Sequence, residues 1–228
     1  MGRIIKQRFS SERRNTKAIR LLLLGGVVSA PLFYAAAIVQ SFTRTGFDIR
    51  RHAISTLTLG DMGWIQSANF ILTGLLAICA AIGVRRLLRG RRGGVWGALL
   101  IGIYGIGMIL AGMFLPDPGL SFPPGAPAER PAFMSGDAAM HSAAFFTAFI
   151  CLIAAGIVFA RRFASVGERG WSIYCMGSCI LAPALIMIGS SIASWIGVIM
   201  GGAGIVAFGW VSILAAKLRA EALRTTEV

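Results

Sequence analysis

Long stretches without a charged residue are the feature that most limits what this chain can fold into. Four of them run from Leu21 to Thr43, Met62 to Val84, Gly93 to Pro116 and Ala138 to Ala160, and the last is unbroken from Gly170 to Ala216. A helix needs about 20 apolar residues to cross the hydrocarbon core of a bilayer, so each of the first four fits one span. The last stretch is about twice that length and predicts two spans with a turn near residues 190–194.

The composition also indicates a chain that lies largely in lipid. Of 228 residues, 56% are apolar and 14% are charged, whereas about a quarter of a soluble domain is charged. No alternating pattern of transmembrane strands is present, and helices satisfy their own backbone hydrogen bonds in lipid. The sequence therefore predicts an all-α, polytopic membrane protein, a six-transmembrane-helix bundle. We expect one transmembrane domain over residues 21–216, with a basic cytoplasmic tail at residues 1–20 and a second cytoplasmic tail at residues 217–228.

The positions of the basic residues predict the orientation of the bundle. Of the 22 lysines and arginines, all but Arg44, Arg50, Arg51 and Arg130 fall on the side of the two predicted tails. Basic connections remain in the cytoplasm, so we expect an N-in/C-in, multi-pass protein of the cell (plasma or inner) membrane. The net charge of +13 then reflects topology, and the expected partners are membrane lipids, not nucleic acid.

The two predicted outer loops differ from the short inner connections. The first, at about residues 44–61, places Ile49, Ala53, Ile54 and Leu57 at helical spacing, which predicts a short helix on the membrane surface. The second, at about residues 117–136, is rich in proline, which predicts neither helix nor strand. Loops of this length often carry function, and we expect this one to cover a site.

Both histidines and several other polar residues fall near the outer side of the membrane. Asp137 and His141 are four residues apart at the start of the fourth span, so they share a helix face. In the second span, a polar stripe is expected to face the bundle interior, because lipid solvates such groups poorly. The stripe consists of Gln66, Asn69 and Thr73. The candidate site residues are Arg51, His52, Ser55, Gln66, Asn69, Asp137 and His141.

These residue types are consistent with four interpretations. In the first, His52, Asp137 and His141 bind a divalent metal that keeps an open position for water. In the second, His141 is a general acid or base that Asp137 orients. In the third, the pocket binds a headgroup or small polar ligand, and Arg51 pairs with its phosphate. In the fourth, the polar groups only attach the loops to the helix ends. A haem is disfavoured, because only His141 falls within a predicted span.

Several short motifs, in this order, resemble the bacterial and archaeal membrane family called domain of unknown function 998. The first outer loop contains Arg51, Ser55 and Leu57 in an Arg-x-x-x-Ser-x-Leu pattern, followed by Gly63-Trp64. The second span contains Asn69-Phe70 and Gly74, and the fourth opens with Gly136-Asp137-x-x-x-His141 after a loop rich in proline and glycine. The resemblance covers most of the chain from the first span to the sixth. It implies a six-span bundle with an outward polar pocket, and it implies no activity.

The sequence thus predicts an integral membrane protein with an outward-facing His/Asp/Arg pocket that binds or acts on a lipid or lipid-linked substrate. Two other interpretations stay open. In one, the protein is a transporter or binds a small ligand in the same pocket, and in the other it is a non-catalytic partner in a membrane assembly. Whether the protein is an enzyme, which cofactor it uses and its oligomeric state are left undecided by the residues.

Overall fold

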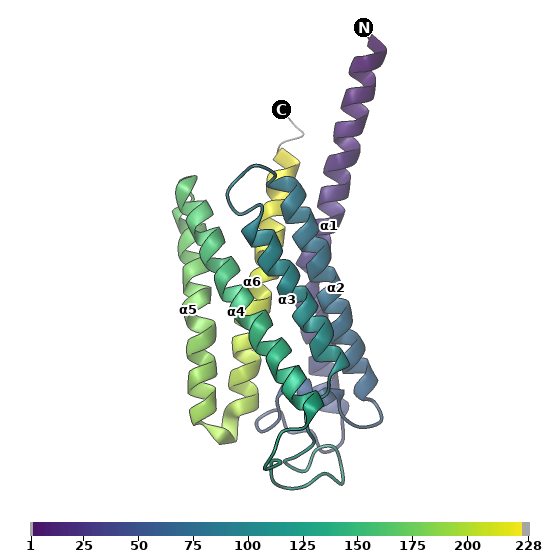
Figure 1. Ribbon diagram of the computed structural model, residues 1–228, viewed down its shortest axis with the longest axis vertical. Helices are drawn as coiled ribbons and strands as arrows, with labels where there is room; N and C mark the ends of the chain where they lie inside the picture. Colours follow the sequence, from purple (N-terminus) through teal and green to yellow (C-terminus); the bar gives the residue numbers. More distant parts are fainter. Residues whose placement is uncertain (1, 225–228) are drawn as a thin grey trace.

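The computed structural model describes residues 2–224, with side chains from residue 14 onward except at position 193. Over that range the chain forms six long helices (Figure 1). They are α1 (Gly2–Thr43), α2 (Gly63–Leu87), α3 (Trp96–Met113), α4 (Gly136–Ser165), α5 (Arg169–Ser191) and α6 (Ile196–Arg224). Two short 3-10 helices, η1 (Ile54–Thr58) and η2 (Ala193–Trp195), lie in the connections. No strand occurs among these described residues, so the all-α prediction is confirmed.

All six long helices of the described chain have the length and apolar composition needed to cross a membrane, so the protein is a multi-pass membrane protein. The predicted division of the last apolar stretch is confirmed, because α5 ends at Ser191 and α6 begins at Ile196. Two helices extend into the segments predicted as tails, since α1 begins at Gly2 and α6 ends at Arg224. Lysine and arginine are good helix formers, so the last apolar residue marks the edge of the lipid but not the end of the helix.

The start of α1 and the end of α6 lie at one end of the bundle, which we call the terminal end (Figure 1). The opposite end, the loop end, contains residues 44–62, residues 114–135 and the turn between α5 and α6. The short helix predicted in the first loop is the five-residue η1, which does not include Ile49. The second loop contains only an isolated bridge between Gly119 and Phe122, in agreement with its proline content.

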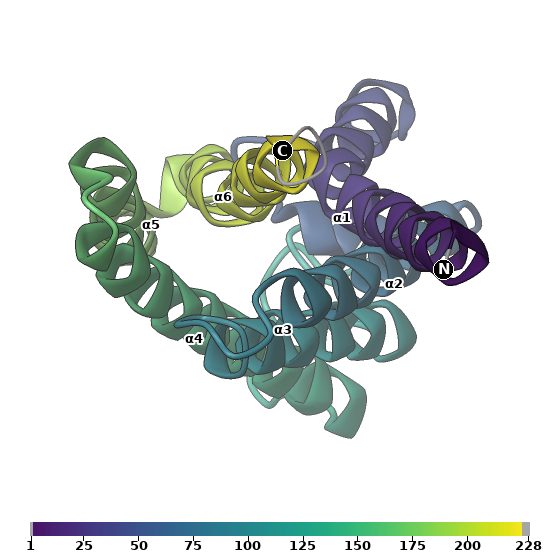
Figure 2. The same cartoon turned by 90° about the horizontal axis from the view of Figure 1, so that it is seen from above.

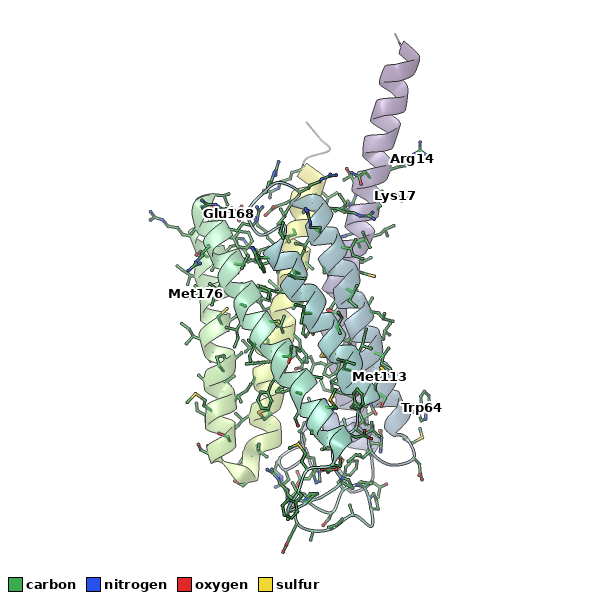
Figure 3. The ribbon with its side chains drawn as sticks, viewed as in Figure 1. Arg14, Lys17, Trp64, Met113, Glu168 and Met176 are labelled. Carbon is green, nitrogen blue, oxygen red and sulfur yellow. The ribbon has the colours of Figure 1, made fainter. Side chains whose placement is uncertain are left out.

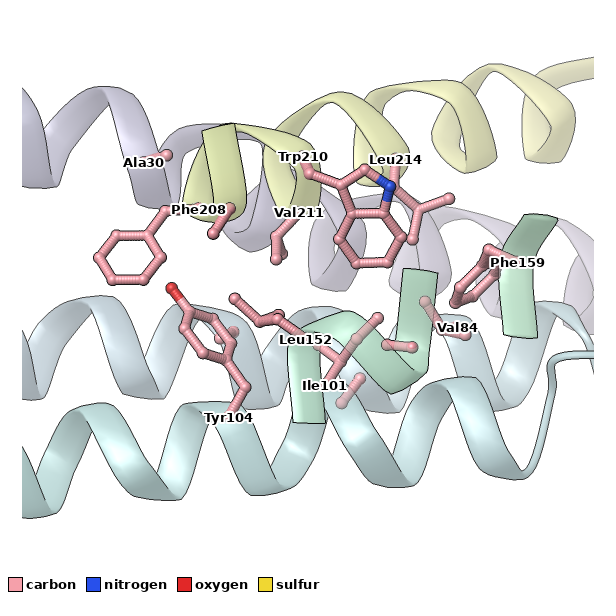
Figure 4. Close-up of a cluster of buried hydrophobic side chains, with 14 of the residues drawn as sticks. Ala30, Val84, Ile101, Tyr104, Leu152, Phe159, Phe208, Trp210, Val211 and Leu214 are labelled. Carbon is pink, nitrogen blue, oxygen red and sulfur yellow. The ribbon is translucent and has the colours of Figure 1, made fainter. Parts of the chain in front are cut away.

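The helices pack closely where glycines face one another. A Cβ atom at Gly74 would lie 2.4 Å from the carbonyl oxygen of Gly105, and one at Gly105 would lie 2.7 Å from that of Gly74. Small residues of this kind let two helix backbones approach in a membrane, where dispersion rather than exclusion of water holds helices together. Larger side chains from α3, α4 and α6 fill the bundle axis; they include Ile101, Tyr104, Leu152, Phe159, Phe208 and Trp210 (Figure 4).

The contact between α4 and α6 is confined to part of their length. In their terminal-end halves, the ring centroids of Phe159 and Trp210 are 6.0 Å apart, and Arg162 Nη2 lies 3.1 Å from Glu221 Oε2. Lys217 Nζ lies 2.7 Å from an oxygen of Glu168, which is labelled at this end in Figure 3. Helix α4 is inclined to α6, and α5 lies at the edge of the bundle against both (Figure 2). Towards the loop end, residues of both α4 and α6 line a cavity.

Candidate functional site

The cavity in the loop-end half of the bundle has a volume of about 650 Å³. Its walls come from α1, α2, α3, α4 and α6, and the two loops cover it. Most of the lining is apolar and includes Phe33, Tyr34, Phe70, Met108, Ala111, Phe145, Phe149, Ile196, Met200 and Phe208. The polar or charged residues of the lining are Tyr34, Arg51, His52, Ser55, Thr56, Asp117, Arg130, His141 and Ser142. The site is therefore an apolar chamber with polar groups gathered where it meets the loops.

The two loops are bound to each other through a few contacts. Arg44, directly after α1, donates from Nη1 to the carbonyl oxygen of Leu57 at 3.1 Å and from Nη2 to that of Leu59. Its guanidinium carbon lies 5.6 Å from the ring centroid of Phe122 in the second loop. Burial lowers the pKa of Arg44, with a smaller opposing effect of Asp61. Because Arg44 contacts residues of both loops, it holds the two loops next to each other at the loop end of the cavity.

His52 lines the cavity, but both of its ring nitrogens already have protein partners. Nδ1 accepts a hydrogen bond from the backbone N–H of Asp48 at 2.9 Å, so the proton of the neutral ring is on Nε2. Nε2 is 3.0 Å from the carbonyl oxygen of Leu120 and donates to it. The ring also lies against Phe47 and Phe122, at centroid distances of 5.4 and 5.3 Å. His52 therefore connects the first loop to the second, whereas the fourth interpretation of the sequence expects polar groups to attach the loops to the helix ends.

His141 is buried in the first turns of α4, and one of its nitrogens has no protein partner. Nδ1 lies 3.0 Å from the carbonyl oxygen of Ala111 and 2.9 Å from that of Phe114, both at the end of α3. Two acceptors on one nitrogen require that Nδ1 carries the proton, which leaves a lone pair on Nε2. Nε2 has no hydrogen-bond partner among the described residues, and the ring lines the cavity. His141 can therefore accept a proton or hydrogen bond from a molecule in the cavity.

Asp137 does not take the position expected from its spacing to His141. It is exposed in the first turn of α4, it is not part of the cavity lining, and no hydrogen bond joins it to His141. The carbonyl groups of α3 orient the imidazole instead, because the ring turns towards the neighbouring helix and away from the surface. The cap of α4 is Ser135, whose Oγ accepts from the backbone N–H of Ala138 at 3.2 Å.

The polar stripe of α2 faces the interior, as predicted, but it lies outside the cavity. Gln66, Asn69 and Thr73 are all buried. Asn69 Nδ2 donates to the carbonyl oxygen of Phe33 at 3.0 Å, and Gln66 Oε1 accepts from Gln40 Nε2 at 2.8 Å. Asn69 Nδ2 also donates to Gln66 Oε1 at 3.1 Å. Gln66 and Asn69 thus join α2 to α1, and the partner on α1 was missed because nothing in the linear spacing places Gln40 opposite this stripe.

Two of the predicted binding residues, Arg51 and Ser55, do line the cavity, and they are joined by two residues that the sequence analysis missed. Hydrogen bonding with the side chain of Ser135, and then with its backbone, lowers the pKa of the Asp117 carboxyl group. The backbone N–H of Ser135 donates to Asp117 Oδ2 at 2.9 Å. Arg130 lies in the proline-rich loop, where no helical or strand period relates it to other positions. In the sequence, Arg130 is distinguished only by its positive charge, because few basic residues are predicted on the outer side of the membrane.

The expected metal set is not formed. No group of three His, Cys, Asp or Glu side chains in the described part of the chain is placed to hold a metal ion. Asp137 is on the surface, and both nitrogens of His52 have partners, so these two residues and His141 do not combine into one ligand set. Within the described part of the chain, His52, Asp137 and His141 therefore do not form the ligand set of the first interpretation.

The fold and the cavity define a class: a multi-pass helical membrane protein whose interior cavity is apolar along its walls and polar at one end. The sequence model of the family described as Protein of unknown function (DUF998) matches residues 27–217, and the chain belongs to that family. The matched range contains every residue that lines the cavity. This match confirms the resemblance seen in the sequence motifs. No curated protein and no solved structure matches the chain.

Proposed function

We propose that the protein binds an amphipathic lipid or lipid-linked molecule in the loop-end cavity. The observation that carries the proposal is the composition of the lining: apolar side chains of several helices, α4 and α6 among them, together with Arg51, Ser55, Arg130 and His141 towards the loops. A volume of about 650 Å³ lies within the range of about 300–1,000 Å³ typical of ligand pockets. The acyl chains would lie between α4 and α6, with the headgroup beneath the loops.

The substitution Gly201→Phe tests this proposal, because Gly201 lines the cavity on α6. A Cβ atom there would meet only Ile54 Cδ1, at 3.6 Å, so the ring is expected to enter the cavity without disturbing the backbone. We expect native mass spectra of the detergent-extracted protein to show at least about tenfold less bound lipid, equivalent to about 1.4 kcal/mol.

The matched control is Gly202→Phe, one residue further along the same helix. A Cβ atom at Gly202 has no neighbour within 4 Å, and this residue is not part of the lining. The control is expected to retain lipid like the unmodified protein, with a similar thermal midpoint. Equal lipid retention in both phenylalanine variants would show that the cavity is not the binding site.

A catalytic form of the same proposal depends on His141. Its Nδ1 is held by two carbonyl groups, and its Nε2 has no protein partner among the described residues, as a general base or acid requires. In this form the protein is an enzyme that acts on the bound lipid. No comparable observation favours the transporter or assembly interpretations.

We also propose the N-in/C-in orientation in the plasma membrane, which places the cavity in the outer leaflet. Basic residues concentrate towards the terminal end, where Arg14 and Lys17 are labelled in Figure 3. Exposed tryptophans, Trp64 near the loop end and Trp96 near the terminal end, suit the two membrane interfaces. Excess positive charge favours the cytoplasmic side for the terminal end.

Single cysteines test the orientation in intact cells. In a variant with the four native cysteines replaced by alanine, Ala128→Cys in the second loop is expected to react with a membrane-impermeant maleimide. Val166→Cys, in the exposed connection between α4 and α5, is expected to react only after the cells are permeabilised. The opposite labelling pattern would place the cavity in the cytoplasmic leaflet.

A further inference from the structure

Four arginines lie at the loop end, and two of them already form side-chain hydrogen bonds within the protein. Arg44 donates to the carbonyl groups of Leu57 and Leu59. Arg50 forms two hydrogen bonds with Asp48, at 3.0 Å from Nε and 2.8 Å from Nη2. The bonds to Arg50 lower the pKa of Asp48 to about 2, so the carboxylate is ionised and the pair is neutral at physiological pH.

The other two arginines, Arg51 and Arg130, have no side-chain hydrogen bond or ion pair within the described part of the protein. Both line the cavity, and both also line an adjoining groove of about 540 Å³ that contains Asp48, Arg50, Ser194 and Trp195. Leu120 is the third residue that the two spaces share. The two unpaired guanidinium groups are therefore at the junction between an apolar chamber and a polar groove.

Arg51 and Arg130 come from different loops, and the structure holds these loops together. His52, the neighbour of Arg51, donates to the carbonyl oxygen of Leu120 in the second loop at 3.0 Å. The carboxylate that also lines the cavity, Asp117, accepts a hydrogen bond from Ser135. Three arginines and two aspartates line the two spaces together, so an anion would meet an excess of positive charge.

We propose that Arg51 and Arg130 bind the phosphate group of a lipid, so that the ligand is a phosphate-bearing lipid with its acyl chains in the cavity. This inference rests on the proposed function and adds the class of headgroup. Acyl chains are solvated about as well by the bilayer as by an apolar cavity, so the walls alone select poorly among lipids. Guanidinium groups bind phosphate oxygens through paired, charge-assisted hydrogen bonds, which gives the polar end its selectivity.

The test compares two lipids with the same chains. The full-length protein is freed of lipid in detergent, and binding of dioleoyl phosphatidic acid, dioleoylglycerol and inorganic phosphate is measured by native mass spectrometry. We expect the phosphatidic acid to bind at least about tenfold more tightly than the diacylglycerol. The double variant Arg51→Gln/Arg130→Gln is expected to lose this difference, whereas the exposed terminal-end variant Arg161→Gln keeps it.

The outcomes separate this inference from the proposed function. If the two lipids bind equally, or if the double variant still prefers phosphatidic acid, the phosphate assignment is overturned. The lipid site itself then stands only if Gly201→Phe still removes both lipids. If inorganic phosphate binds as tightly as phosphatidic acid and Gly201→Phe leaves that binding unchanged, the arginines bind a soluble anion and the lipid assignment fails. Thermal midpoints close to that of the unmodified protein show that each variant is folded.

Discussion

Glu221→Leu is expected to lower the free energy of unfolding by about 3 kcal/mol. Glu221 Oε2 is 3.1 Å from Nη2 of Arg162, whose side chain is only 7% exposed. Among the described residues, removing the carboxylate leaves that guanidinium group buried with one hydrogen bond, to the carbonyl oxygen of Arg92 at 3.3 Å. Because Glu221 is itself 24% exposed, we expect the lower end of the range for buried ion pairs. The thermal midpoint in detergent measures the loss.

The double variant Arg162→Leu/Glu221→Leu serves as the comparison. It removes both charges, so most of the stability is expected to return, because no uncompensated charge remains in the interior. Arg161→Leu, on the exposed neighbour of Arg162, controls for the loss of a positive charge at this end of α4. A Glu221→Leu variant as stable as the unmodified protein would mean that the pair between α4 and α6 does not stabilise the terminal end.

The second large effect concerns His141, for which alanine and asparagine are expected to behave differently. His141→Ala removes a buried ring and leaves the carbonyl groups of Ala111 and Phe114 without their shared donor. Unsatisfied buried groups cost about 1–3 kcal/mol, and the space left by the ring adds to that, so we expect a loss of about 2–4 kcal/mol. His141→Asn places an amide N–H₂ group near the position of Nδ1, and we expect it to retain most of the stability.

The asparagine variant also tests the catalytic form of the proposed function. It keeps the donor towards α3 but has no counterpart of Nε2, the atom without a protein partner. If Nε2 moves a proton, the turnover of bound lipid, followed by thin-layer chromatography of radiolabelled phosphatidic acid, is expected to fall at least about a hundredfold at unchanged lipid binding. Turnover at the rate of the unmodified protein in His141→Asn would exclude His141 as the acid or base.

Much of the fold follows from properties that each residue has on its own. The preference of an apolar stretch for lipid depends on its length and composition, so the six spans and the division near residues 190–194 were predicted correctly. The helix ends were predicted less well, because α1 and α6 continue through basic residues that are good helix formers. The family resemblance was also readable in the linear motifs, since these are local by nature.

The candidate site was predicted only in part, and the reason is visible at individual residues. Arg51, His52, Ser55 and His141 line the cavity, as the clustering of polar residues on one side of the membrane suggested. Asp137 was placed beside His141 because the two share a helix face, yet the imidazole is bound by carbonyl groups 27 and 30 residues away on α3. Spacing along one helix defines which residues are neighbours, but not which way each side chain turns.

What the sequence determined by itself is therefore the class of fold and the end of the bundle at which the polar candidate residues gather. Each residue prefers lipid or water according to its own hydropathy and charge, so the membrane-spanning segments can be predicted from the sequence. The tertiary structure alone decided that Gln66 and Asn69 form hydrogen bonds with α1 outside the cavity. It also decided that His52 joins the two loops, and that Arg51 and Arg130 line the same cavity. A buried polar group takes its partner from whichever segment the packing brings within hydrogen-bond distance, and in this bundle most of those segments are distant in sequence.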